Sequence, residues 1–157
     1  MDLILFETPL GPMGLAAEDD KLIRLYLPGE GVPRIACRET PLLIKAREEL
    51  LSFLRWGRKD FDLPLDPEGT DFQKEVWAAC ARIPYGTTCS YGELAEQLGR
   101  SASSAAAVGQ ALKANPLPIL IPCHRVIGKN GSLTGYSGGL ENKKFLLALE
   151  GSLPESI

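Results

Sequence analysis

The predicted secondary structure differs before and after residues 57–69. This segment contains two prolines and two glycines and shows no helical periodicity, which is typical of a linker. Short apolar runs separated by turn-forming residues come before it, and segments with helix start signals come after it. With 157 residues, the chain is long enough for two small domains. We therefore expect an α+β fold, with one domain over residues 1–66 and a second over residues 70–157.

The first domain is predicted to be a small sheet with one helix. Strands are expected at residues 3–8, 14–18 and 22–27. A turn at Asp19-Asp20 separates the last two strands, because aspartate favours tight turns. Thr40 precedes Pro41, the pattern of an N-cap followed by proline at the first helical position. Apolar residues then recur at helical spacing to about Arg55.

Two capping boxes mark helix starts in the second domain. They are Thr-Asp-Phe-Gln at residues 70–73 and Ser-Tyr-Gly-Glu at residues 90–93. The first helix is expected to end near Arg82 and the second before Gly99, and a last helix is expected at residues 140–150. The side chains expected to point inward from the first of these helices are Phe72, Val76, Trp77 and Cys80.

Another helix is expected from Ser101 to Ala114. Its alanines, serines and glycine would allow either close packing against a neighbouring helix or close approach to a nucleic-acid groove. Residues 118–121 are apolar and β-prone, and Lys-Asn-Gly-Ser at residues 129–132 predicts a β-hairpin. A helix-turn-helix followed by a hairpin indicates a winged DNA-binding domain.

The net charge of −3 is unevenly distributed. Residues 1–70 hold 9 basic and 13 acidic side chains, whereas residues 71–157 hold 8 and 7. From Arg100 to Lys144 the sole acid is Glu141, and the bases are Arg100, Lys113, Arg125, Lys129, Lys143 and Lys144. These bases could form a local surface that contacts phosphates, although an ordinary solvated surface would look the same. No apolar run is long enough to span a membrane, and the acidic N-terminus is unlike a signal peptide, so a cytoplasmic protein is expected.

Cys123 is followed directly by His124, which is the single histidine of the chain. A basic neighbour can turn a thiol into a nucleophilic thiolate, but a buried cysteine beside a packed histidine would give the same pair. Adjacent residues of a strand point to opposite faces, so the two cooperate only if the chain bends or a water molecule relays the proton. A carboxylate should orient the histidine, and Glu150 is a candidate. The scattered cysteines and lone histidine argue against a zinc site.

Four segments together closely resemble the O6-alkylguanine-DNA alkyltransferases, also called methylated-DNA–protein-cysteine methyltransferases. They are Asn115-Pro116, Pro122-Cys123-His124-Arg125-Val126, Gly135-Tyr136-Ser137-Gly138-Gly139-Leu140 and Leu146-Leu147-Ala148-Leu149-Glu150-Gly151. The resemblance covers about residues 70–151, and the N-terminal part is more weakly similar to the small ribonuclease-H-like domain of that family. It implies a winged helix-turn-helix alkyltransferase domain that acts on alkylated double-stranded DNA as a monomer, without cofactor or metal.

The resemblance implies that Cys123 accepts the alkyl group of a flipped O6-alkylguanine, once per molecule. O4-alkylthymine is a second candidate substrate. His124 would take the thiol proton through a water molecule while Glu150 holds the imidazole. Asn115 would brace the active-site turn, and Tyr91 would donate a proton to the departing guanine. The residues implied to contact the base are Val126, Tyr136, Ser137 and Gly138.

The DNA-contacting residues implied by the same resemblance are Arg100, Ala102, Ala105, Ala106, Gly109, Gln110, Lys113 and Arg125. The family usually carries an Arg-Ala-Val-Gly run, whose arginine enters the duplex from the minor groove and fills the gap left by the flipped base. Here the run is Ala-Ala-Val-Gly, so the arginine position is Ala106. We expect weaker binding and slower repair of duplex DNA, with transfer from a free modified guanine less affected.

Three other functions fit parts of the sequence. An alkyltransferase-like protein would bind the lesion without reacting, but such proteins lack the cysteine that is present at position 123. A winged-helix regulator would need base-reading side chains, and the first turns of the helix from Ser101 contain no Asn or Arg. A cysteine hydrolase would need an oxyanion-binding arrangement, of which the motifs show no sign.

Overall fold

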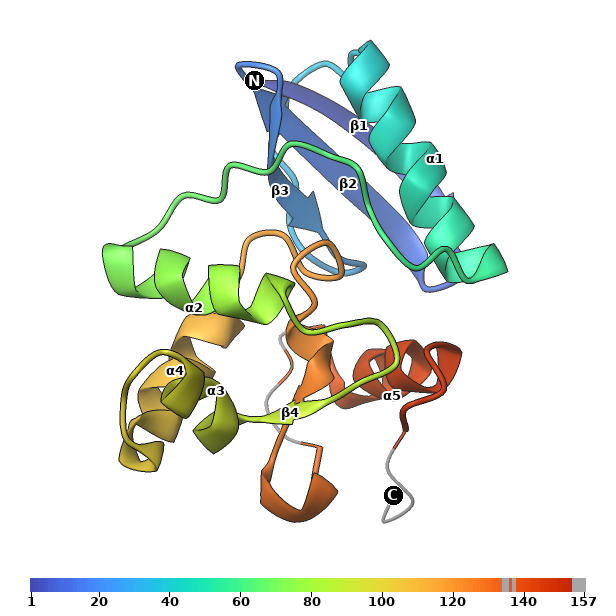
Figure 1. Ribbon diagram of the computed structural model, residues 1–157. Helices are drawn as coiled ribbons and strands as arrows, with labels where there is room; N and C mark the ends of the chain where they lie inside the picture. Colours follow the sequence, from blue (N-terminus) through green and yellow to red (C-terminus); the bar gives the residue numbers. More distant parts are fainter. Residues whose placement is uncertain (134–135, 137, 154–157) are drawn as a thin grey trace. The chain divides into compact units, whose positions relative to one another are not determined.

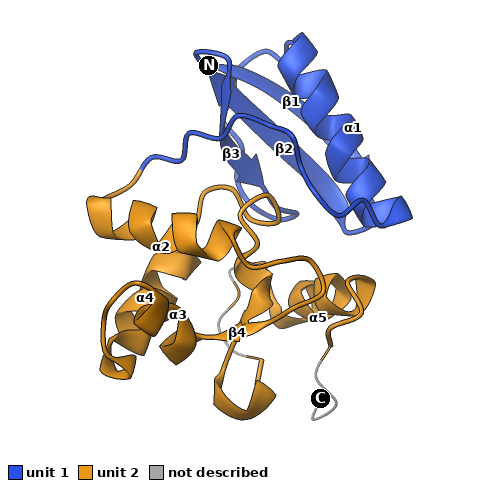
Figure 2. Ribbon diagram, in the orientation of Figure 1, with its two compact units in different colours: residues 1–68 blue, residues 69–157 orange. Residues whose placement is uncertain are grey.

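The computed structural model describes residues 1–133, 136 and 138–153. Contacts within the chain divide it into two compact units, Met1–Glu68 and Gly69–Ile157 (Figure 1, Figure 2). Helices and small sheets both occur, so the mixed α and β composition expected from the sequence is confirmed. Over the described ranges, no helix is both long and apolar enough to cross a membrane.

The first unit contains a three-stranded antiparallel sheet in the order β1-β2-β3. The strands are β1 (Asp2–Thr8), β2 (Gly11–Glu18) and β3 (Lys21–Tyr26). β2 begins earlier than expected, because Gly11 pairs directly with Thr8 across a two-residue turn. At the second turn, Asp19 and Asp20 both have positive φ, the conformation that a tight two-residue hairpin loop uses.

One helix, α1 (Pro41–Trp56), packs against β1 and β2 (Figure 1). The Leu43 N–H donates to the Thr40 hydroxyl at 3.2 Å, and Gly57 ends the helix in a left-handed conformation. The predicted N-cap and the proline at the first helical position are therefore confirmed. Leucines and Phe53 at helical spacing are buried on the face that meets the sheet.

The segment predicted as a linker is partly ordered against the first unit. Leu65 forms an isolated parallel bridge with Leu22 of β3. The Leu22 N–H donates to Pro64 O at 2.9 Å, and the Asp66 N–H donates to Leu22 O at 2.8 Å. A linker over the whole of residues 57–69 is therefore wrong, because backbone hydrogen bonds attach residues 64–66 to the edge of the sheet.

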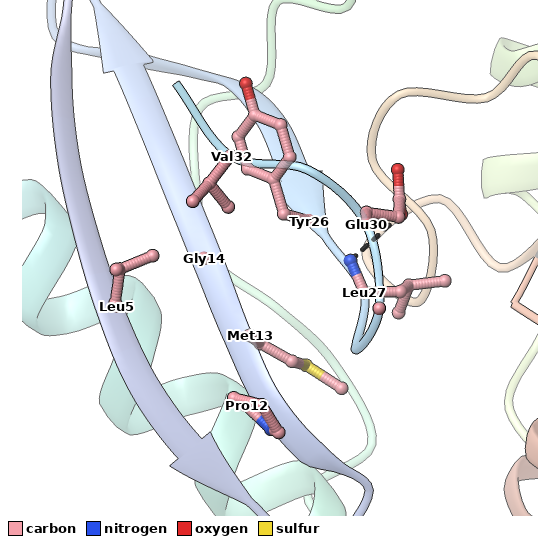
Figure 3. Close-up of a pocket in the computed structure, with 9 residues that line it drawn as sticks. Leu5, Pro12, Met13, Gly14, Tyr26, Leu27, Glu30 and Val32 are labelled. Carbon is pink, nitrogen blue, oxygen red and sulfur yellow. Dashed lines mark hydrogen bonds between the residues drawn. The ribbon is translucent and has the colours of Figure 1, made fainter. Parts of the chain in front are cut away.

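A shallow pocket of about 170 Å³ opens on the first unit (Figure 3). Its lining is mostly apolar and comes from β1, β2, the end of β3 and the loop that follows. The Leu27 N–H donates to Glu30 Oε1 at 2.9 Å, and Arg24 pairs with the other carboxylate oxygen at 2.8 Å, so the loop is held in place. None of the site residues predicted from the sequence lines this pocket.

The second unit consists of helices around a two-stranded parallel sheet. The helices are α2 (Asp71–Ala81), α3 (Tyr91–Gln97), α4 (Ala105–Lys113) and α5 (Leu140–Leu149), and the strands are β4 (Cys89–Ser90) and β5 (Val126–Ile127). Both predicted capping boxes are confirmed, at Thr70 and Ser90. Val76, Trp77 and Cys80 are buried as expected, and the Trp77 indole donates to Ala111 O of α4 at 2.8 Å. Figure 1 shows the α3–α4 pair and α5 on opposite sides of β4.

Two predictions for this unit are wrong in detail. The helix expected from Ser101 begins with a 3-10 turn at Ala102–Ser104, and Ser101 makes no side-chain capping bond, so α4 starts only at Ala105. Residues 118–121 turn back on themselves instead of forming a strand, because prolines flank and interrupt them. The tight turn predicted at residues 129–132 is present, because Asn130 and Gly131 both have positive φ and the Gly128 N–H donates to Ser132 O at 2.7 Å, while the preceding strand β5 pairs with β4. Residues 134–135 of the expected hairpin lie outside the described residues.

Candidate active site

Cys123 opens a 3-10 turn, Cys123–Arg125, that leads into β5. The Cys123 N–H donates to Ile121 O at 2.7 Å, and the Arg125 N–H donates to Pro122 O at 2.9 Å. The chain therefore bends at Cys123, and a bend is one of the two alternatives that would allow Cys123 to cooperate with His124. The turn contacts both α2 and α5, so its side chains are buried within the second unit.

The loop before Cys123 is held by the side chain of Asn115. Its Nδ2 donates to Ile121 O at 3.0 Å, and its Oδ1 accepts from the Leu117 N–H at 2.9 Å. Ile119, inside this loop, has a φ of 73°, which is strained for a β-branched residue. Strain of this kind persists only where surrounding contacts fix the backbone, and it is concentrated at functional sites. The structure thus places Asn115 where a brace of the Cys123 turn is needed.

His124 is fully buried, and its Nε2 lies 2.7 Å from Oε2 of Glu150. Burial lowers the pKa of His124, although Glu150 acts in the opposite direction, so the imidazole is neutral at pH 7. Because a carboxylate only accepts hydrogen bonds, Nε2 carries the proton and donates it to Glu150. Nδ1 then holds the lone pair, and it has no hydrogen-bond partner within the described residues.

Glu150 caps the end of α5 and is buried there, so it is not a surface acid. Arg125 binds it through two bonds of 2.9 Å, from Nε to Oε1 and from Nη2 to Oε2. Burial by itself raises the pKa of the Glu150 carboxyl, but the hydrogen bonds from His124 and Arg125 outweigh it and lower that pKa. Glu150 is therefore a carboxylate that fixes both side chains.

The prediction that Arg125 contacts DNA is wrong. Its side chain is buried, it is paired with Glu150, and its Nη1 donates to Ile83 O at 2.7 Å. A guanidinium held by three buried acceptor contacts is not available to phosphates. Arg125 instead ties the Cys123 turn to the end of α5 and to the segment after α2.

The surroundings of the Cys123 thiol act on its pKa in opposite directions. Burial raises the pKa, and a hydrogen bond from Asn115 and the charge of Lys143 lower it. The balance leaves the pKa above its ordinary value, so the resting side chain is a thiol. Such a thiol needs a base to become a nucleophile. His124 is the adjacent residue, and the lone pair on its Nδ1 makes it the candidate base.

The pairing of β4 with β5 brings Tyr91 toward this turn. β4 ends at Ser90, directly before Tyr91, and Cys89 pairs with Val126. A pocket of about 500 Å³ opens next to Tyr91, within the size range of small-molecule sites. Its lining residues are Ser90, Tyr91, Gly92, Glu93, Glu96, Ala102, Ala105 and Lys129. Two of the residues predicted to face DNA thus lie beside the residue predicted to donate to the base.

The other predicted base-contacting residues are only partly described. Val126 follows the Cys123 turn directly and is buried. Tyr136 is buried and Gly138 is half-buried. Ser137 lies outside the described residues.

α4 presents one buried and one exposed face. Val108, Ala111 and Leu112 are buried, whereas the residues that lie exposed are Ala106, Ala107, Gln110 and Lys113. Gly109 faces Tyr91, and a Cβ there would lie 3.7 Å from the Tyr91 ring, an ordinary van der Waals distance, so α4 packs against Tyr91 without requiring a glycine. Close packing is therefore confirmed for the buried face of α4, and the approach of its exposed face to a nucleic-acid groove stays a prediction.

Arg100 is exposed but already has partners. Its guanidinium lies 4.7 Å from the centre of the Phe72 ring and 3.9 Å from Glu75. It therefore rests on α2 in this structure.

Comparison with known proteins gives consistent matches. The model of the family "6-O-methylguanine DNA methyltransferase, DNA binding domain" matches residues 71–152. The constitutive methylated-DNA–protein-cysteine methyltransferase of Bacillus subtilis is 47% identical over 92% of this chain and 92% of its own length. The corresponding protein of Methanosarcina acetivorans is 45% identical over 94% and 97%.

The chain belongs to the 6-O-methylguanine DNA methyltransferase family. Among solved structures, that of Mycobacterium tuberculosis OGT in complex with DNA superimposes with a TM-score of 0.87 at 40% sequence identity. The match covers 98% of this chain and 95% of that one. The two units therefore share their fold with a methyltransferase that has been crystallised on DNA.

The family motifs did not point to Lys143, which the sequence analysis counted among the surface bases. Lys143 is fully buried on α5, and its Nζ donates to Val126 O at 2.7 Å. The helical periodicity of the sequence could have revealed that Lys143 is buried. Lys143, Leu146, Leu147 and Glu150 are spaced i, i+3, i+4 and i+7, so they share one face of a helix, and the two leucines mark that face as buried.

Proposed function

We propose that this protein repairs DNA by moving the alkyl group of O6-alkylguanine onto Sγ of its own Cys123, once per molecule. The observation that carries this proposal is the buried hydrogen bond of 2.7 Å between His124 and Glu150, adjacent to the cysteine. It fixes the imidazole tautomer whose Nδ1 can accept a proton. Family membership supplies the substrate class, because the relatives are named for transfer from methylated DNA to a protein cysteine.

The transfer needs two proton movements. The Cys123 proton passes through a water molecule to Nδ1 of His124, and the imidazolium is stabilised by the Glu150 carboxylate. The thiolate then attacks the alkyl carbon, an S–C bond forms, and the O6–C bond breaks with its electron pair remaining on the guanine. Tyr91 donates its hydroxyl proton to the departing base. The product is an uncharged thioether that water does not cleave, so each molecule reacts once.

We further propose that the substrate is a flipped guanine of double-stranded DNA. α3 and α4 would form the helix-turn-helix, with exposed Gln110 and Lys113 near the DNA backbone and Tyr91 beside the flipped base. The protein would act from the minor groove as a monomer in the cytoplasm. Support comes from the M. tuberculosis relative, whose crystal structure contains DNA.

Ala106 should limit activity on duplex DNA. It lies exposed on α4, and its methyl group cannot fill the space of a flipped base. Ala106→Arg should speed alkyl transfer from duplex DNA severalfold and leave transfer from free O6-benzylguanine unchanged. Ala107→Arg is the matched control, because Ala107 is also exposed on α4 and gains the same charge. Equal acceleration by both variants would show a general electrostatic effect and refute a specific role of position 106.

The function is tested by the intact mass of the protein after mixing with an O6-methylguanine duplex. We expect a gain of one methyl group per molecule, located on the Cys123 peptide and lost in Cys123→Ser. Cys37→Ser is the control, because Cys37 is exposed and outside the site. Binding of the lesion with no mass change would overturn the proposal and indicate a non-catalytic lesion-binding protein.

A further inference from the structure

Trp56, the last residue of α1, leaves a large aromatic surface in solvent. It is 82% exposed, more than any other large apolar residue in the part of the chain that the structure describes. A tryptophan can bury about 150–250 Å² when it is covered, so most of the contact area of this indole is unused. The other tryptophan, Trp77, is 2% exposed and belongs to the core of the second unit.

The exposed indole lies within a basic stretch of an otherwise acidic unit. Residues 55–59 contain three bases and no acid, whereas residues 1–70 together hold 9 basic and 13 acidic side chains. Arg55 and Lys59 are exposed on either side of Trp56 in the sequence. Bases near the end of a helix interact favourably with its dipole, which accounts for Arg55. The helix dipole does not account for an exposed tryptophan between two bases.

The chain reverses directly after Trp56 and is held against α1. Gly57 has a φ of 74°, and its N–H donates to Phe53 O at 3.3 Å. Nη2 of Arg58 lies 3.2 Å from Oε1 of the buried Glu49. The indole and the bases around it therefore extend from an ordered support, which reduces the conformational entropy that binding would cost.

Nearby acids leave this stretch with a positive balance. Two acids follow it, Asp60 and Asp62, and Asp62 is paired with Lys45 at 3.1 Å. Asp60 therefore stands against both Arg55 and Lys59. An aromatic ring with two cationic side chains beside it is the combination with which proteins bind single-stranded nucleic acids.

We propose that Arg55, Trp56 and Lys59, together called the α1 tip, form a contact for single-stranded DNA on the first unit. A base stacks on the indole, and the two cationic side chains contact the flanking phosphates. A single strand fits this surface because its base faces are accessible, whereas those of a duplex are covered by neighbouring bases. The contact goes beyond the proposed alkyl transfer, which uses residues of the second unit.

The fluorescence of Trp56 reports on this contact directly. The probe is an oligothymidylate of about twelve nucleotides, within the range of common single-strand site sizes. It contains no guanine and is therefore no substrate of the proposed transfer. The oligothymidylate should quench the fluorescence of the full-length protein. In Trp56→Phe the remaining signal comes from the buried Trp77 and should not be quenched.

Affinity for the labelled oligothymidylate, followed by fluorescence anisotropy, measures the stacking and the charge separately. Trp56→Ala should raise the Kd by about fivefold or more, the effect of losing one stacked base. Arg55→Met and Lys59→Met should each reduce the slope of log affinity against log salt by about 0.7. Lys21→Met is the matched control, because it removes an exposed charge elsewhere on the same unit, and it should change neither quantity.

Several results would overturn the proposal. They are failure of the wild type to bind the oligothymidylate, equal quenching in Trp56→Phe, and wild-type affinity of Trp56→Ala. Polyglutamate that quenches Trp56 equally well would show a contact for any polyanion. An undamaged duplex that binds as tightly through Trp56 would refute the preference for single strands.

These measurements are separable from the test of the proposed function. Every variant of the α1 tip should take the alkyl group from free O6-benzylguanine at the wild-type rate, which also checks that the second unit is folded. A protein that takes no methyl group onto Cys123, but whose Trp56 is quenched as expected, would refute the repair function and support the α1 tip. Methyl transfer without Trp56-dependent binding would have the opposite meaning.

Discussion

Glu150→Gln is the substitution whose effect follows most directly from the structure. Three hydrogen bonds of 2.7 to 2.9 Å, from His124 and Arg125, converge on the two oxygens of this buried carboxylate. Glutamine keeps one oxygen and replaces the other with an NH₂ group, so at least one donor would face another donor. The substitution also leaves the buried Arg125 charge without its counter-ion.

Breaking a buried ion pair by removing one partner costs about 3–5 kcal/mol. Glutamine preserves part of the hydrogen bonding, so we expect the free energy of unfolding of the second unit to fall by about 3 kcal/mol. This is a large part of the 5–15 kcal/mol that is typical of a whole protein. Alkyl transfer should also slow by about 100-fold, the lower end of what a positioned general base contributes.

The assay is urea unfolding at pH 7, followed by the fluorescence of Trp77. Trp77 is 2% exposed and belongs to the second unit, whereas Trp56 is 82% exposed, so a Trp56→Phe background isolates the signal. Glu141→Gln on the same helix is the control and should stay within about 0.5 kcal/mol of the wild type, because Glu141 is exposed. A Glu150→Gln variant within about 1 kcal/mol of the wild type would refute the view that this carboxylate supports the site.

The buried Glu150 carboxylate also predicts how folding stability depends on pH. The pKa of Glu150 is lower in the folded protein than its ordinary value of 4.5, so its contribution to stability is complete above that pH. The contribution is lost as the pH falls below 4.5 and through the folded pKa. Wild-type stability should therefore decline more steeply than that of Glu150→Gln between pH 4.5 and the acid limit of folding. Parallel acid profiles would contradict this assignment.

Three further substitutions test the supports of the site. Asn115→Ala leaves the Leu117 N–H without its acceptor, so stability should fall by about 1–3 kcal/mol in urea unfolding and single-turnover alkyl transfer should slow; an unchanged rate would show that the loop needs no brace. Gly69→Ala would place a Cβ 2.5 Å from the Trp77 ring, so a loss of about 1–3 kcal/mol is expected, and wild-type stability would mean that the backbone shifts freely. In Arg125→Lys, lysine cannot reproduce the bidentate contact with Glu150, so we expect a lower melting temperature and an unaltered DNA affinity. Weaker DNA binding with an unchanged melting temperature would instead show that Arg125 contacts DNA.

Local signals in the sequence predicted most helix starts correctly, for a physical reason. A capping box such as Thr70 with Gln73 satisfies its backbone donors within four residues, so its outcome does not depend on the rest of the fold. The tight turn expected at residues 129–132 is likewise local and is present, but the strand before it has a partner that the turn signal did not predict. β5 pairs with β4, more than thirty residues earlier in the chain, and Val126 is completely buried there. A long-range contact of this kind leaves no trace in a short window of sequence.

The same distinction between local and long-range signals applies to the residues of the site. The adjacent cysteine and histidine led to Cys123, His124 and the candidate Glu150, the resemblance supported them, and the structure places the last two in direct contact. Charge counting treated Arg125 and Lys143 as surface bases, and both are buried. The count failed because a positive charge in the sequence carries no information about its partner, and these partners are a carboxylate and a main-chain carbonyl from other elements.

The helical periodicity of α5 places two charged residues, Lys143 and Glu150, on its buried face. Lys143 and Glu150 stand at the two ends of one buried stripe, with Leu146 and Leu147 between them. The leucines hold the stripe against the core, and the spacing of seven residues separates the two charges by about 10 Å along the helix. Lys143 can therefore act at the Val126 side of the turn while Glu150 acts at the His124 side. One rigid helix thus holds both the Val126 carbonyl and the His124 imidazole, so a change that shifts α5 along its axis should disturb both groups together.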